Sequence, residues 1–119
     1  MGADHMNENE KWDDSNDAML DIIEGIEDSK EPKIPIKCPI CNTYNAHIYM
    51  HCWEEGRGTI WTWCSKCRSC AHASRVNLPK WWENADFIEI SELTAHPVFL
   101  EPKAAMIDRH LSQLLEICN

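Results

Sequence analysis

The sequence predicts an α+β fold in which a small antiparallel sheet is flanked by an N-terminal and a C-terminal helix. Apolar residues recur at helical spacing near both ends of the chain, whereas the middle holds short segments rich in β-branched and aromatic residues. Two Cys-x2-Cys pairs bracket the first two of these segments. Residues 1–12 read as a cloning remnant followed by a disordered tail, and residues 13–119 as a single domain.

The N-terminal helix is predicted within residues 13–28. Its inner face follows the i, i+3, i+4, i+7 pattern, with Met19, Ile22, Ile23 and Ile26. Its opposite face is an acidic stripe made of Asp17, Asp21, Glu24 and Asp28. Pro32 and Pro35 prevent the helix from continuing, so residues 30–35 are expected to be an extended linker.

The sheet is predicted from three segments. Residues 44–52 and 59–63 are expected to pair as a hairpin around a turn at 54–58, because both have strand composition and the turn contains two glycines. Residues 71–76 are expected to return as a third strand, and Pro79 to open a short helical turn.

The C-terminal helix is predicted to start near Pro102. Its inner face is expected to carry the apolar residues Ala104, Ile107, Leu111, Leu114, Leu115 and Cys118.

The cysteine pairs predict one structural zinc ion. Zinc prefers four ligands in a tetrahedron, and a Cys-x2-Cys turn brings two thiolates to one side of it. Cys38, Cys41, Cys64 and Cys67 supply two such turns, and the intervening residues have the length of one hairpin. The sequence therefore predicts a zinc ribbon, with the metal joining the two turns.

The second pair is ambiguous, because Cys67 and Cys70 also have Cys-x2-Cys spacing. We favour Cys64 because the strand at 59–63 leads directly into it, which leaves Cys70 as a buried thiol at the start of the third strand. Asn42 and Arg68 stand where a knuckle usually has glycine; asparagine tolerates a positive φ well and arginine less so, which makes the second knuckle fit the pattern less well than the first. His72 is expected to be a strand residue that hydrogen-bonds near the site.

The sequence does not favour an enzyme. A site of four thiolates is closed, whereas a catalytic zinc keeps one position open for water. The deaminase pattern of His-x-Glu followed by Pro-Cys-x-x-Cys is not present. A nucleophile among Cys52, Cys70 and Cys118, served by His47, His51 or His72, has no supporting order along the chain.

The charge of −9 is unevenly distributed. Residues 1–31 carry −9, residues 32–80 carry +5 and residues 81–119 carry −5. The basic middle and the six tryptophans leave nucleic-acid binding open as an alternative, with the aromatic rings as a platform for bases. We favour tryptophans that form the core, because a small ribbon has little else to bury. No segment is apolar enough for a membrane span or a signal peptide, so we expect a cytoplasmic protein without membrane contact.

Residues 61–74 and 79–84, together with Cys38-Pro39-Ile40-Cys41, resemble small bacterial zinc-ribbon proteins that act as immunity proteins of polymorphic toxin and contact-dependent growth inhibition systems. The resemblance covers residues 36–84 and implies a cytoplasmic protein that binds and blocks one cognate toxin, often a nuclease. A basic nuclease would suit an acidic inhibitor, and the stripe of Asp17, Asp21, Glu24 and Asp28 is the expected contact. The region of Trp81 and Trp82, with Glu83, Asp86 and Glu89, is the second choice.

Overall fold

The computed structural model describes residues 12–14, 17–28, 33–89, 91 and 97–118. A 3₁₀ helix η3 (Asp17–Asp21) continues into helix α1 (Ile22–Asp28). Strands β1 (Ala46–Glu54), β2 (Arg57–Cys64) and β3 (Cys70–Asn77) follow. Two 3₁₀ turns, η5 (Pro97–Phe99) and η6 (Glu101–Lys103), lead into helix α2 (Ala104–Cys118). The predicted α+β arrangement is confirmed.

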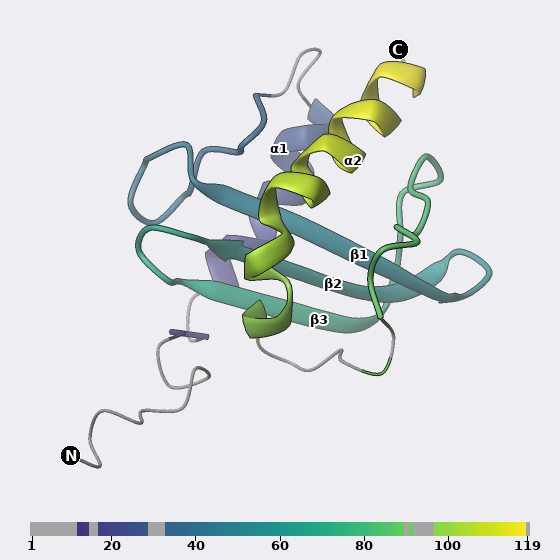
Figure 1. The fold of residues 1–119 in the computed structure, drawn as a ribbon, viewed down its shortest axis with the longest axis horizontal. Coiled ribbons are helices and arrows are strands. Elements are labelled where there is room, and N and C mark those ends of the chain that lie inside the picture. Colours follow the sequence, from purple (N-terminus) through teal and green to yellow (C-terminus); the bar gives the residue numbers. More distant parts are fainter. Residues whose placement is uncertain (1–11, 15–16, 29–32, 90, 92–96, 119) are drawn as a thin grey trace.

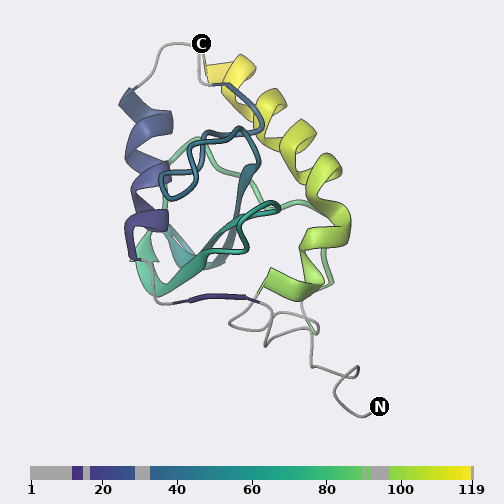
Figure 2. The ribbon, with the colours of Figure 1, turned by 90° about the vertical axis from the view of Figure 1, so that its left-hand side faces the viewer.

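The three strands form one antiparallel sheet in the order β1-β2-β3 (Figure 1). The helices lie on opposite faces of this sheet, so that the strands are seen between α1 and α2 in the side view of Figure 2. All of β2 from Gly58 to Cys64 is buried, because both of its faces are covered and β1 and β3 flank it.

The face of the sheet toward α2 is aromatic. Cross-strand pairing places Tyr49 opposite Trp61 and His47 opposite Trp63, and their rings are in contact, with centroids 6.1 Å and 5.4 Å apart. Trp82 packs its ring edge against Tyr49 with centroids 5.5 Å apart. Trp61, Trp63 and Trp82 are buried, so these three tryptophans build the core as we predicted. Because side chains alternate along a strand, Ile48 and Met50 face the other way, toward η3 and α1.

The first helix starts later than predicted. The chain at Asp13 is extended and forms a parallel bridge with Ser69, with the Asp13 amide donating to the Arg68 carbonyl (2.9 Å) and the Cys70 amide to the Asp13 carbonyl (2.8 Å). Trp12, which we had assigned to the N-terminal tail, is only 6% exposed and lies under the Arg68 guanidinium. These contacts hold residues 12–14 against the second knuckle, and Asp17 is the first helical residue in the described part of the chain. The predicted inner face is otherwise present, since Met19, Ile22 and Ile26 are buried.

The C-terminal helix agrees with the prediction. Ile107, Leu111 and Leu114 are buried, and Pro102 lies in the 3₁₀ turn that precedes α2. Cys118 ends the helix, and its side chain is outside the described residues. No helix in the described part of the chain has the length and apolar character needed to cross a bilayer.

Candidate metal centre

Four cysteine sulfurs from two loops meet beside the sheet. Cys38 and Cys41 lie in the loop before β1, whereas Cys64 ends β2 and Cys67 follows it. The pairing of Ala46 with Cys64 brings the two loops together, and the Ile36–Ala46 bridge fixes the first loop against β1. The ligands are therefore positioned by the register of the β1–β2 hairpin.

The sulfur positions match a tetrahedral metal site. The Sγ atoms of Cys38 and Cys67 are 3.7 Å apart, as are those of Cys41 and Cys64. All four sulfurs lie within 4.8 Å of one another. A tetrahedron with metal–sulfur bonds of about 2.3 Å places its sulfurs about 3.8 Å apart. A single ion thus has room at the centre of the cluster.

The two loops have the same internal geometry. The Asn42 amide donates to the Cys38 carbonyl (2.9 Å), and the Arg68 amide donates to the Cys64 carbonyl (3.0 Å). Asn42 has a φ of 63° and Arg68 a φ of 65°, so arginine adopts the same left-handed conformation as asparagine at this position. Each loop reverses direction at this residue, and that reversal turns both of its sulfurs toward the other loop.

Backbone amides point at the first cysteine of each loop. The amides of Ile40 and Cys41 lie 3.3 Å and 3.5 Å from Cys38 Sγ. Those of Lys66 and Cys67 each lie 3.4 Å from Cys64 Sγ. Hydrogen bonds to sulfur favour the thiolate, the form that binds metal.

Hydroxyl groups accompany the second cysteine of each loop. Thr43 Oγ1 lies 3.0 Å from Cys41 Sγ, and Cys67 Sγ lies 3.4 Å from Ser69 Oγ. These two hydroxyls, and Met19 Sδ at 3.9 Å from Cys38 Sγ, contact the cluster, rather than the predicted His72. His72 is a strand residue as predicted, but it is exposed on β3 opposite Trp61. Both hydroxyls stand two residues after a cysteine, a repeated spacing that the sequence contained and that we did not use.

Thiol acidity differs across the cluster. The hydroxyl and the backbone amide of Thr43 lower the pKa of Cys41 to about 6. Burial raises the pKa of Cys64 to about 12 and also raises that of Cys38. The buried thiols therefore hold their protons at neutral pH until a cation replaces them, so metal binding releases protons.

The other cysteines lie apart from the cluster. Cys70 is buried at the start of β3, opposite Trp63, and burial raises the pKa of its thiol to about 12. Cys52 lies in β1, with its thiol donating to the Glu54 carbonyl (2.9 Å). Among the described residues, the sulfur cluster contains Cys64 and not Cys70, which favours our first choice of ligands.

A polar chain links the second knuckle to the C-terminal region, and sequence reasoning missed it. His47 Nδ1 lies 2.8 Å from Asp108 Oδ1 on α2, and its Nε2 lies 2.8 Å from Ser65 Oγ. The Ser65 hydroxyl donates to Glu101 Oε1 (2.7 Å), which also accepts from Trp63 Nε1 (2.9 Å). These residues come from four separate segments of the chain, so no local sequence motif predicts that they meet.

Asp108, His47 and Ser65 contact one another in the order of a hydrolase triad. Glu101, which also contacts Ser65, argues against a catalytic role for this serine. Both Glu101 carboxylate oxygens lie within 2.9 Å of the Ser65 hydroxyl and can only accept its single proton, so they compete with His47 Nε2 for it. A carboxylate beside the nucleophile would also repel the oxyanion that forms during acyl transfer. The arrangement is suited to fastening α2 and η6 onto the knuckle.

The acidic stripe is exposed where its side chains are described. Asp17 and Asp21 lie in η3 and Glu24 in α1, all on the surface, while the side chain of Asp28 is outside the described residues. The elements that carry these residues, η3 and α1, lie on the sheet face opposite α2 (Figure 2). The second-choice surface has exposed Glu83, Asp86 and Glu89, but Trp82 beside them is buried.

A comparison of the chain with protein-family models, with curated proteins and with solved structures finds no match in any of the three. Inference about function therefore rests on the geometry described above.

Proposed function

We propose that this chain is a zinc-binding protein whose single zinc ion is structural. The sulfur cluster carries this proposal, because its spacing fits one tetrahedral ion and thiolates supply all four ligands. Such a site has no open position for water, and the metal would act by holding the Cys38–Cys41 loop to the Cys64–Cys67 loop. Iron also accepts four thiolates, so the metal must be identified directly.

Elemental analysis of the protein tests this proposal. We expect one zinc per chain, and we expect a strong chelator to unfold the ribbon, since structural zinc contributes its binding free energy to folding. Cys38→Ser should abolish stoichiometric zinc. Cys70→Ala is the matched control, because it removes a buried thiol outside the cluster and should retain the metal. A protein that stays fully folded and metal-free in chelator would contradict the proposal.

We further propose that the zinc-stabilised fold serves to bind and neutralise a cognate protein toxin. The observation that supports this is the exposure of the acidic side chains of Asp17, Asp21 and Glu24; the resemblance of residues 36–84 to immunity proteins, for which the comparisons find no match, suggests only the class of partner. A basic toxin, such as a nuclease, would be attracted to that surface, and the attraction would speed association. The proposed action is occupation of the toxin's substrate groove and requires no chemistry by this chain.

Co-expression with the product of the neighbouring reading frame tests the toxin proposal. If that product is toxic to the cell, the present chain should restore growth and should co-purify with it as a complex. A chain carrying Cys38→Ser should fail to protect because its ribbon does not form. The proposed function would be contradicted if a neighbouring gene encodes a toxin and the intact chain does not relieve the growth arrest that this toxin causes.

A further inference from the structure

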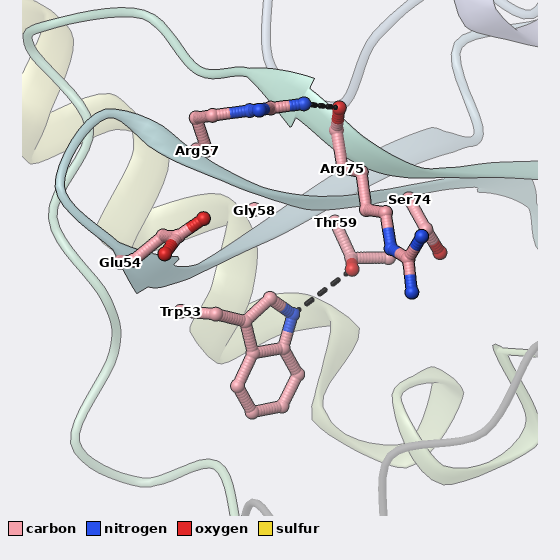
Figure 3. Close-up of a pocket in the computed structure, with 7 residues that line it drawn as sticks. All are labelled: Trp53, Glu54, Arg57, Gly58, Thr59, Ser74 and Arg75. Carbon is pink, nitrogen blue, oxygen red and sulfur yellow. Dashed lines mark hydrogen bonds between the residues drawn. The ribbon is translucent and has the colours of Figure 1, made fainter.

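A hollow of about 320 Å³ lies at the end of the sheet away from the four-cysteine cluster, where β1 turns into β2. Figure 3 shows its lining, to which all three strands contribute. The side chains that the argument uses are Trp53 and Glu54 from β1, Arg57 and Thr59 from β2, and Arg75 from β3. Neither the metal centre nor the acidic stripe includes any of them.

Two β-bulges build this hollow. The β1–β2 register shifts between Cys52 and Glu54, which leaves Trp53 as the extra residue. The β2–β3 register shifts between Gly58 and Ile60, so that two β3 residues, Ser74 and Arg75, stand where only Thr59 is opposite. A bulge redirects the side chain of the inserted residue, and bulges are enriched beside functional sites. Here the two bulges flank Thr59 and bring an indole and a guanidinium to one hollow.

The backbone of the hollow is conformationally costly. Arg75 has a φ of 57°, a left-handed conformation that few residues other than glycine adopt readily. Gly58 lies so close to β1 that a Cβ would collide with the His51 carbonyl oxygen. Such features persist where the surrounding structure imposes them, and they concentrate at binding sites.

Trp53 is fixed in place and yet open to solvent. Its Nε1–H donates to Thr59 Oγ1 (2.9 Å), and its ring centroid lies 4.4 Å from that of His51. The residue is nevertheless 51% exposed, in contrast to the buried Trp12, Trp61 and Trp63. An indole that is already immobilised loses little entropy when a second ring stacks on it.

Charged groups stand around this indole. Arg57 donates through Nη2 to the Arg75 carbonyl (2.6 Å), which holds the two arginines together at the rim. The Arg75 guanidinium extends on the same side of the hollow as Trp53, and Glu54 lies next to Arg57 (Figure 3). The hollow therefore offers a stacking surface, a donor for an anion and a carboxylate acceptor within one small volume.

We propose that this hollow binds a nucleotide unit, a nucleobase with its ribose and one phosphate. Trp53 stacks on the base, Arg75 binds the phosphate, and Glu54 accepts a hydrogen bond from a ribose hydroxyl or an exocyclic amine. The volume is at the lower end of the range of small-molecule sites, which suits one nucleotide. Such a nucleotide unit occurs either as a free nucleotide or as part of a single-stranded nucleic acid. The net charge of −9 disfavours binding of a nucleic-acid strand with many phosphates.

Titration calorimetry at physiological salt tests the proposal with AMP, adenosine, ribose 5-phosphate and a single-stranded octanucleotide. AMP should bind saturably, and each half-ligand at least tenfold more weakly. Trp53→Leu should weaken AMP about tenfold and leave ribose 5-phosphate unchanged. Arg75→Gly should weaken AMP and ribose 5-phosphate but not adenosine, and glycine suits the backbone at this position. Arg109→Ala, an exposed arginine on α2, is the control of equal charge change.

The outcomes separate the alternatives. If the octanucleotide binds and both Trp53→Leu and Arg75→Gly abolish that binding, then the hollow binds one nucleotide of a single-stranded nucleic acid. The absence of saturable binding of both AMP and the octanucleotide up to millimolar concentration would overturn the proposal. It would also fail if Arg109→Ala weakened AMP as much as Arg75→Gly does, or if an acidic peptide occupied these residues and AMP did not.

Discussion

Asn42 and Arg68 hold equivalent positions, each directly after the second cysteine of its knuckle. Both adopt a positive φ, and in both the amide closes the loop onto the first cysteine's carbonyl. The two side chains differ in what else they do. Arg68 places its guanidinium over the Trp12 ring, 4.6 Å from the centroid, whereas no comparable contact involves Asn42 among the described residues. Backbone conformation can thus be tested cleanly only at Asn42.

We expect Asn42→Ala to lower the free energy of unfolding by about 1 kcal/mol, since a Cβ-bearing residue without asparagine's local hydrogen bonding is strained at this φ. Asn42→Gly should be close to neutral. Urea denaturation measures the free energy of unfolding of both variants. The zinc excess is kept fixed so that any stabilisation by bound metal is compared at the same metal concentration. Equal stability of the alanine and glycine variants would mean that the loop does not impose this conformation on the folded protein.

His51 is the residue for which a pH effect is expected. Desolvation lowers its pKa below 6.5 in the folded protein, so the unfolded chain takes up the proton first as the pH falls. The stability contributed by neutral His51 is therefore present above about pH 6.5 and is lost below it. Each unit of pH below 6.5 costs at most about 1.4 kcal/mol until the folded-state pKa is reached.

His51→Gln should remove this dependence. The difference in unfolding free energy between pH 7.5 and pH 5.5 is expected to be smaller in the variant than in the parent protein. His72→Gln is the matched control, because His72 is exposed on β3, and it should leave the difference unchanged. An unaltered pH dependence in His51→Gln would show that burial of this imidazole does not disfavour its charge.

Among the secondary-structure elements, those determined by local sequence, the three strands and the two cysteine knuckles, were predictable. Alternation and composition located the three strands to within about two residues at each end, and the cysteine spacing located both knuckles. The later start of the first helix was not predictable in this way. It depends on Asp13 bridging to Ser69, a partner far along the chain. The bulges at Trp53 and Arg75 were missed for a similar reason, because register is decided between strands and not within one.

Helix α2 is attached by a polar contact as well as by its apolar face. We expect Asp108→Asn to lower the free energy of unfolding by about 1–3 kcal/mol, because it weakens the contact with buried His47. Hydrogen exchange should show the loss at the α2 amides. Glu116→Gln, an exposed acid on the same helix, should have little effect. Identical exchange in the two variants would show that apolar packing alone holds α2.

For the whole molecule, the arrangement of layers separates its surfaces. The helices cover opposite faces of the sheet, so η3 and α1, which carry the acidic stripe, are separated from α2 by the sheet (Figure 2). The hollow lined by Trp53 and Arg75 is at a third location, at one end of the sheet (Figure 3). A protein partner at the stripe would therefore leave the hollow accessible.

Charge reversal on the stripe tests the proposed toxin interface. Asp21→Lys with Glu24→Lys should slow association with a basic toxin, and the effect should shrink at high salt because ions screen the attraction. Dissociation should change less. Glu55→Lys with Glu116→Lys gives the same change in net charge at exposed sites outside both the stripe and the second-choice surface, and its effect should be smaller. Equal slowing by both pairs, in stopped-flow association, would mean that only net charge matters.

The order of the ligands along the chain has a consequence for synthesis. All four of these cysteines precede α2, and 36 residues lie between Cys67 and Ala104. At about 5–20 residues per second, the ribosome needs roughly 2–7 seconds for that interval. A β-hairpin forms in about 1–10 μs. The nascent ribbon would therefore have time to capture the proposed metal ion while the aromatic face of Tyr49, Trp61 and Trp63 is still uncovered. During those seconds the last helix cannot protect the nascent sheet from pairing with other chains, whereas a bound ion would hold its two knuckles together.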